Sequence, residues 1–216
     1  MRYKAILFDF DGVIGKTMED NYNAWAYAFR SVGIQLDKTK YFLLEGLDAR
    51  GVAKTILGKH SMSKSLAIKI VEIKEKHYLE HNSFMFYPGV LDLIEGIRSQ
   101  FKLGLVSGAT YKRLHRTVPP DFLGKFETIV TGDKVENPKP APEPYLLASK
   151  NLNVDSSYCL VVENAPLGIE SAKKANMECV AICSTLDRRY LSKADFIIEN
   201  IVELRNCMNA INGNRL

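Results

Sequence analysis

Two aspartates, Asp9 and Asp11, follow a short apolar run and constrain the fold of this chain more than any other feature. The run Ala5-Ile6-Leu7-Phe8 has the composition of a buried strand, and Gly12 comes directly after the second aspartate. Side chains alternate between the two faces of a strand, so both carboxylates would project together from its end. Two adjacent buried anions repel each other. The pattern therefore predicts a neutralising cation, or a nucleophile paired with a proton donor.

Segments with strand-like and helix-like patterns alternate over the second half of the chain. Apolar strand candidates lie at 102–106, 128–131, 158–162, 179–182 and 196–198, and each is followed by polar or turn residues. Helical patterns, such as 144–151 and 167–176, lie between them. This alternation is typical of a parallel sheet covered by helices on both faces. With a first strand at 3–10, the sequence predicts an α/β, Rossmann-like core of three layers with a mostly parallel sheet.

The segment from Met18 to Glu80 interrupts that alternation. Apolar residues recur there at helical spacing, as at Trp25 and Phe29, and no convincing strand is present. We therefore expect a core formed by residues 1–15 and 85–216 and an inserted, all-helical cap at 16–84. Ligands bind at the carboxyl ends of the strands in open α/β sheets, so a cap inserted after the first strand would cover the site as a lid.

The composition argues against several classes of function. The net charge is +4, and no basic cluster is interleaved with aromatic residues, so we expect no nucleic-acid partner. No apolar run approaches the ~20 residues of a membrane span, and no signal-peptide pattern is present. The four cysteines include no Cys-x-x-Cys pair, and Cys159 and Cys183 lie in or beside apolar, strand-like runs, so we expect reduced thiols in the core. We expect a cytoplasmic protein without a membrane partner, as a monomer or a weak homodimer.

Further polar residues follow the other predicted strands. Ser107 and Gly108 come after the strand at 102–106, where a hydroxyl, backbone N–H groups and a helix N-terminus would suit a phosphate. Lys139 lies between two prolines, which restrict the local backbone. Glu163 and Asn164 follow the strand at 158–162 and supply oxygen atoms suited to a hard divalent cation. These residues predict a site for a phosphoryl group and a metal ion.

In order and placement these residues resemble the four motifs of the haloacid dehalogenase superfamily. Asp9-Phe10-Asp11-Gly12-Val13 is similar to the first motif, Ser107 to the second, Lys139 to the third, and the segment from Glu163 to Ile169 to the fourth. A serine or a lysine alone is a weak signal, but the four together span the chain. The segments 137–145 and 163–168 resemble the β-phosphoglucomutase-like phosphatase branch, whose members carry a helical cap.

The resemblance implies a mechanism and a cofactor. Asp9 would attack the phosphorus of a small phosphorylated metabolite, and Asp11 would protonate the leaving alcohol and later activate water. Ser107, Gly108 and Lys139 would hold the phosphoryl group. Mg²⁺ would be bound by Asp9, by Asp11 through its backbone carbonyl, and by the acidic motif at Glu163 and Asn164. The resemblance thus favours a Mg²⁺-dependent phosphatase acting on a sugar phosphate or a related monoester.

Two departures from the family pattern bear on this expectation. Relatives often have Glu-Asp in the fourth motif, whereas this chain has Glu163-Asn164, so the site would carry less negative charge. Mutases of the branch carry a cap histidine where this chain has Asn21, and their cap loop differs from the segment 46–50. Asn21 and Arg50 are the candidate substrate contacts from the cap, although a solvated helix face also explains Arg50. A β-phosphoglucomutase-type mutase and a non-catalytic sensing or protein-binding module remain alternatives.

Overall fold

The computed structural model describes residues 2–60, 62–63 and 65–213. Its centre is a parallel sheet in the order β3-β2-β1-β4-β5-β6. The strands are β1 (Ala5–Phe8), β2 (Lys102–Ser107), β3 (Thr128–Thr131), β4 (Cys159–Glu163), β5 (Glu178–Ile182) and β6 (Phe196–Ile198). The predicted α/β core with a parallel sheet is confirmed. The order reverses between β1 and β4, and this is the point where open α/β sheets bind ligands.

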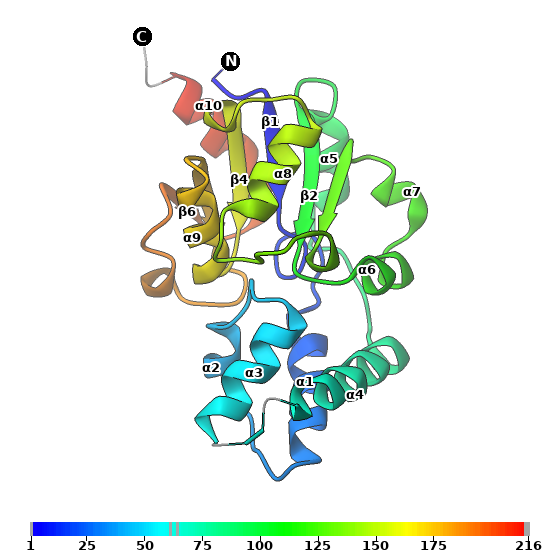
Figure 1. Cartoon of the computed structure of the whole chain (residues 1–216). Coiled ribbons are helices and arrows are strands. Elements are labelled where there is room, and N and C mark those ends of the chain that lie inside the picture. The colour runs from blue at the N-terminus through cyan, green and yellow to red at the C-terminus, as the bar shows by residue number, and fades with distance from the viewer. Residues whose placement is uncertain (1, 61, 64, 214–216) are drawn as a thin grey trace.

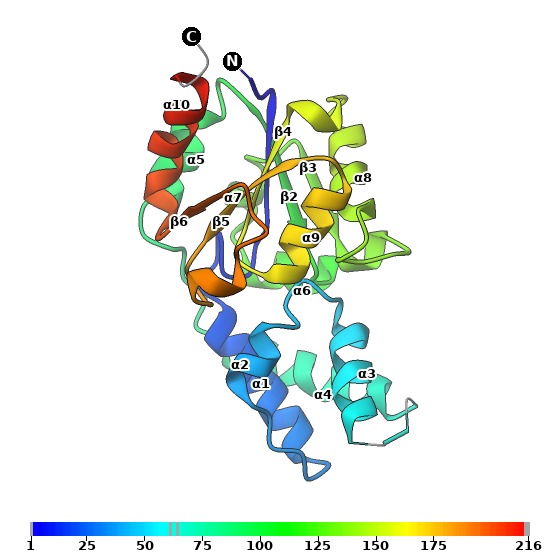
Figure 2. The same cartoon turned by 90° about the vertical axis from the view of Figure 1, so that its left-hand side faces the viewer.

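Helices cover both faces of the sheet, as Figure 2 shows with the sheet between them. They are α5 (Val90–Ile97), α6 (Tyr111–Thr117), α7 (Pro120–Leu123), α8 (Glu143–Asn151), α9 (Pro166–Lys174) and α10 (Leu204–Gly213). Alternate residues of β1 belong to different cores: Ala5 and Leu7 pack with the α8 and α9 side, and Ile6 and Phe8 with the α5 and α10 side. The period-two pattern of the strand therefore builds the three layers.

The described helices between β1 and α5 form a separate lobe beside the carboxyl ends of the strands (Figure 1). They are α1 (Met18–Arg30), α2 (Lys38–Phe42), α3 (Ala49–Lys59) and α4 (Leu66–His81). Asp37 and Asp48 accept hydrogen bonds from the backbone N–H groups of Lys40 and Gly51, which caps α2 and α3. Helix α1 packs along α4, and α3 packs on α4 as well. We call this lobe the cap.

Two connecting segments join the cap to the core, and they pair with each other. The N–H of Lys16 donates to the carbonyl of Met85 at 2.8 Å, and the N–H of Tyr87 donates to the carbonyl of Ile14 at 3.1 Å. The predicted boundaries, 15/16 and 84/85, fall within these segments. The first strand ends at Phe8, earlier than the expected residue 10, because the chain turns at Phe10, whose carbonyl accepts from the N–H groups of Ile14 and Gly15.

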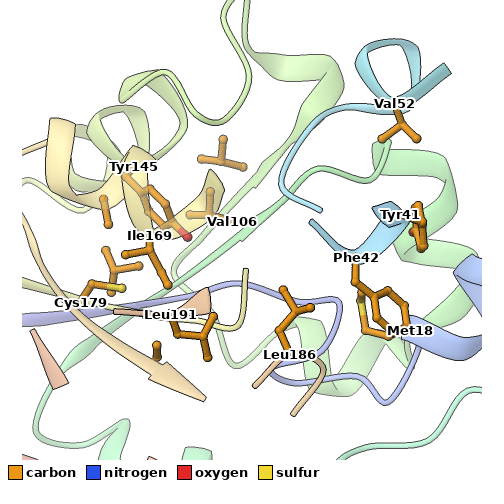
Figure 3. Close-up of a cluster of buried hydrophobic side chains, with 14 of the residues drawn as sticks. Met18, Tyr41, Phe42, Val52, Val106, Tyr145, Ile169, Cys179, Leu186 and Leu191 are labelled. Atoms are coloured by element: carbon orange, nitrogen blue, oxygen red, sulfur yellow. The ribbon is translucent and has the colours of Figure 1, made fainter. Parts of the chain in front are cut away.

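A continuous cluster of buried apolar side chains extends from the sheet into the cap. Figure 3 shows Tyr145 and Ile169 of the core and Met18 and Phe42 of the cap, which belong to one cluster. The cysteines are unbridged, as predicted. Within the described ranges, every helix is too short or too polar to cross a lipid bilayer.

Candidate active site

The ends of three neighbouring strands bring the predicted site residues together. Phe8 lies opposite Val162 of β4 and Leu105 of β2, so Asp9 follows β1 at the level where β4 ends in Glu163. Ser107 ends β2 on the other side of β1. The carboxyl ends of parallel strands share one edge of a sheet, and this edge faces the cap.

Lys139 occupies the centre of this edge and is only 2% exposed. Its Nζ donates to Oδ1 of Asp9 and to Oε1 of Glu163, both at 2.7 Å, and to the carbonyl of Val106 at 3.2 Å. Two buried carboxylates near each other and near one ammonium form a compact ionic triad. Burial disfavours the ammonium form of Lys139, but the two carboxylates outweigh this effect and raise its pKa, so the side chain remains charged.

Glu163 is saturated with hydrogen-bond donors. Oε1 accepts from Lys139 and from the Tyr145 hydroxyl at 2.8 Å, and Oε2 accepts from the backbone N–H groups of Asn164 and Ala165 at 2.9 and 3.2 Å. A carboxylate offers about four lone-pair positions, and these donors use all of them. Glu163 therefore orients Lys139 and the loop that follows β4.

Asp9 differs from Glu163 because one of its oxygens has no hydrogen-bond donor among the described residues. Burial raises the pKa of Asp9 above its ordinary value, even though Lys139 opposes this shift. A nucleophilic carboxylate must be ionised. A second cation beside Asp9 would lower its pKa and favour the reactive form.

The donors around Asp9 fit a magnesium ion. Among the described residues, no group of three or more His, Cys, Asp and Glu side chains has the geometry of a metal site. A hard cation accepts mixed oxygen ligands, and Asp9, the Asp11 carbonyl and the Asn164 side chain supply them. At Gly12, φ is +89°, and a Cβ there would lie 2.1 Å from Asn164 Nδ2. Glycine thus allows Asn164 to lie against the loop that carries both aspartates.

Asp11 lies in a different, strongly polar environment. Its Oδ1 accepts from the Thr17 hydroxyl at 2.6 Å and from Asn21 Nδ2 at 2.9 Å, and its Oδ2 accepts from Arg113 Nη2 at 2.9 Å. Burial alone would raise the pKa of Asp11, but the Arg113 guanidinium and these donors outweigh it and lower the pKa. The two aspartates therefore have pKa values shifted in opposite directions. Each shift opposes the state that an ionised nucleophile at Asp9 and a proton donor at Asp11 would require, so the binding of a cation and of substrate must change both before reaction.

Arg113, on α6 of the core, is a site residue that sequence reasoning missed. Besides Asp11, it donates to Asn21 Oδ1 at 2.9 Å, and its guanidinium lies 5.0 Å from the centre of the Tyr78 ring in the cap. Nothing in the sequence distinguishes it from its basic neighbours Lys112 and Arg116. It links the aspartate loop of the core to two cap helices.

Replacing Arg113 with Met is expected to lower the free energy of unfolding by about 3 kcal/mol, because Asp11 would stay buried without its cation. Urea unfolding measures the change, and Arg113→Lys should recover part of it. Arg116→Met is the matched control, since Arg116 is exposed on the same helix and should cost less than about 0.5 kcal/mol. Equal stability of Arg113→Met and wild type would contradict the expectation.

The remaining predicted residues lie at different depths. Ser107 is buried, and its hydroxyl accepts from the N–H of Ala109 at 3.1 Å. Gly108 lines the cavity between core and cap, and Arg50 lies exposed at its rim. Asn21, expected to contact substrate, lines the same cavity, and its side chain binds Asp11 and Arg113.

The cavity has a volume of about 520 Å³, within the range of small-molecule sites. Its lining combines both aspartates with cap residues that sequence reasoning did not identify, namely Glu45, Lys74 and Glu75. Lys74 is nearly fully buried, bonds Glu75 at 2.9 Å and lies 5.5 Å from the centre of the Trp25 ring. The cap therefore closes over the reactive carboxylates with its own charged groups.

Comparisons with known proteins identify the family of this chain. The family model described as haloacid dehalogenase-like hydrolase matches residues 6–182. Validoxylamine A 7'-phosphate phosphatase from Streptomyces hygroscopicus subsp. limoneus is 29% identical over 209 residues, which are 94% of this chain and 96% of that protein. The crystal structure of β-phosphoglucomutase from Clostridium difficile has a TM-score of 0.81 and 29% identity, and the match covers 97% of this chain and 98% of that chain.

Another relative is much longer than this chain. Protein SUPPRESSOR OF QUENCHING 1, chloroplastic, from Arabidopsis thaliana is 29% identical over 203 residues, which are 89% of this chain but 19% of the plant protein. The match to the family model covers most of the chain and includes both aspartates, Lys139 and Glu163. The chain therefore belongs to the haloacid dehalogenase-like hydrolase family, in its β-phosphoglucomutase-like branch, and is an enzyme of the phosphatase or phosphomutase type.

Proposed function

We propose that this enzyme is a Mg²⁺-dependent phosphatase that hydrolyses a small phosphorylated metabolite, a sugar phosphate or a related monoester, through an aspartyl-phosphate. One observation carries the proposal: Asp9 and Asp11 line one cavity between core and cap, and Asp9 bonds the buried Lys139 at 2.7 Å. The Streptomyces relative, whose name describes a phosphatase for a phosphorylated metabolite, supports this class of substrate. A cytoplasmic location and a monomeric or weakly dimeric state are part of the same proposal.

In the first half-reaction, a carboxylate oxygen of Asp9 attacks the phosphorus. A P–O bond to Asp9 forms while the P–O bond to the leaving alcohol breaks, and Asp11 donates a proton to the leaving oxygen. In the second half-reaction, Asp11 takes a proton from water, which attacks the same phosphorus and releases phosphate. Asp9 is then regenerated.

The groups around Asp9 stabilise the charge of the transferring phosphoryl group. Lys139 supplies a fixed positive charge, and its bonds to Val106 and Glu163 hold it in place. Gly108 exposes its backbone to the cavity directly after Ser107. When bound by Asp9, the Asp11 carbonyl and Asn164, Mg²⁺ would add positive charge and favour ionised Asp9.

A β-phosphoglucomutase-type mutase is the second candidate, and the similarity to the Clostridium structure favours it. Such an enzyme would return the phosphoryl group to another hydroxyl of a sugar rather than to water. The cap position where the resemblance leads us to expect a mutase histidine is Asn21, whose amide binds Asp11 and Arg113. An amide cannot relay a proton as imidazole can, so we favour the phosphatase.

Phosphate release from a panel of sugar phosphates, phosphoglycolate, nucleotides and an aryl phosphate tests the proposal. We expect release with Mg²⁺ to exceed release with EDTA by about 100-fold or more, and Mg²⁺ added back in excess should restore it. Equal rates in EDTA would contradict the metal requirement. Conversion of glucose 1-phosphate to an isomer in the presence of a bisphosphate, without net phosphate release, would favour the mutase.

A further inference from the structure

The buried cations that line the cavity or lie directly beside it already have anionic partners. Each of them pairs with a side chain of the protein: Lys139 with Asp9 and Glu163, Arg113 with Asp11, and Lys74 with Glu75. Arg50, the basic residue at the rim, is exposed. A ligand that enters the cavity therefore meets little uncompensated positive charge beyond the site of the phosphoryl group.

In contrast to these paired side chains, Glu45 is a cap carboxyl that lines the cavity and has no cationic partner among the described residues. It accepts a hydrogen bond from the Tyr41 hydroxyl through Oε1. In the described part of the chain, Glu45 has no ion-pair partner, and its second oxygen accepts no hydrogen bond. Burial, together with the nearby charges of Asp11 and Asp9, raises the pKa of Glu45 to about 8, although Arg113 and Lys74 oppose the shift.

The loop that carries Glu45 is packed against the core beside the phosphoryl site. Gly46 has φ +101°, and a Cβ there would lie 3.1 Å from the backbone nitrogen of Gly168 and 3.2 Å from Cβ of Leu167. The carbonyl of Leu47 comes within 3.1 Å of the position that a Cβ on Gly108 would occupy. These contacts hold the loop that carries Glu45 against the core.

We propose that Glu45 selects the leaving group, by binding a hydroxyl of an uncharged, polyhydroxylated alcohol and by excluding an alcohol that carries a second phosphate or a carboxylate. The inference rests on the proposed phosphatase activity and names the class of its substrate. A hydroxyl both donates and accepts hydrogen bonds, which suits the unused oxygen of Glu45. A second anion would lie beside this carboxyl, where the described residues offer no unpaired buried cation to bind it.

The position of Glu45 in the cavity also bears on the choice between a phosphatase and a mutase. A bisphosphate activator would place its second phosphate on the leaving-group side of the cavity, where Glu45 lies. An anion there would meet the same burial and the same negative charges of Asp11 and Asp9 that disfavour the ionised form of Glu45, without an unpaired buried cation in the described residues to offset them. Glu45 thus disfavours the bisphosphate that a mutase requires.

The test compares kcat/KM for two alkyl phosphates on the same enzyme preparation, with Mg²⁺ present. Sorbitol 6-phosphate has an uncharged polyol as its leaving group, and phosphoglycolate has a carboxylate. We expect wild type to prefer sorbitol 6-phosphate by about 10-fold or more, and Glu45→Lys to shift the ratio by about 100-fold toward phosphoglycolate. Glu72→Lys carries the same charge change on an exposed cap position and should leave the ratio unchanged.

A second variant tests the hydrogen bond of Glu45 separately from its charge. Glu45→Met, which keeps the length of the side chain without its hydrogen bonds, should lower kcat/KM for sorbitol 6-phosphate about 10-fold relative to p-nitrophenyl phosphate, which has no such hydroxyl. Because each ratio compares two substrates on one preparation, a loss of folded enzyme cancels. A preference of wild type for phosphoglycolate, or ratios that neither Glu45 variant changes, would overturn the inference.

Hydrolysis of p-nitrophenyl phosphate distinguishes a wrong role for Glu45 from a wrong phosphatase proposal. If wild type hydrolyses p-nitrophenyl phosphate but the Glu45 variants leave the ratios unchanged, the phosphatase proposal stands and the role of Glu45 is wrong. If no phosphate monoester is hydrolysed, including the aryl phosphate, the phosphatase proposal is wrong, and the inference about Glu45 is overturned with it.

Discussion

Replacing Asp9 with Asn is expected to lower the rate of phosphate release by about 10⁴-fold or more, because the amide cannot act as the nucleophile in place of a carboxylate. The substitution keeps the shape of the side chain, and Lys139 retains its bond to Glu163, so the fold should persist. Steady-state phosphate release measures the loss, and circular dichroism checks the fold.

A matched substitution and a direct search for the intermediate make this test specific. Asp121→Asn makes the same chemical change at an exposed position of α7 and should leave the rate unchanged. Acid-quenched wild type should carry a phosphoryl group on the peptide that contains Asp9, detectable by mass spectrometry. An Asp9→Asn enzyme with more than about a tenth of the wild-type rate would exclude Asp9 as the nucleophile.

The fold was predictable because its strongest signals are local. Apolar runs that end in polar residues predicted the strands, and their alternation with helices predicted the parallel sheet. Parallel strands end at one edge, so Asp9, Ser107 and Glu163 were expected to be neighbours before any distance was known. Lys139 follows no strand end directly, and the resemblance to known motifs identified it.

The missed residues owe their role to tertiary packing. Arg113 and Glu45 look like ordinary surface charges in the sequence, and they become site residues only because the cap closes on the core. Tyr145 belongs to an amphipathic helix, and its hydroxyl reaches Glu163 because α8 packs across β2 and β3. The docking of the cap on the core decides which charged residues of a helix line the cavity. The periodicity of the sequence does not contain this information.

Replacing Lys139 with Met should have the largest effect on stability, because it leaves both Asp9 and Glu163 in a buried site without their shared cation. Removing one member of a buried ion pair costs roughly 3–5 kcal/mol, and we expect a value near the upper end. Activity should fall as well, since the transferring phosphoryl group loses its fixed positive charge. Urea unfolding measures the first effect and phosphate release the second.

A double variant tests whether the unpaired carboxylate of Glu163 causes this loss of stability. If repulsion and desolvation of Glu163 cause the loss, Lys139→Met combined with Glu163→Gln should be more stable than Lys139→Met alone, because an uncharged amide is cheaper to bury. Lys150→Met, an exposed change on α8, should alter the free energy of unfolding by less than about 0.5 kcal/mol. If the double variant is no more stable than Lys139→Met, the buried carboxylate of Glu163 is not the source of the loss. The loss would then come from Asp9, which also remains buried without its cation, or from the missing bond to the Val106 carbonyl.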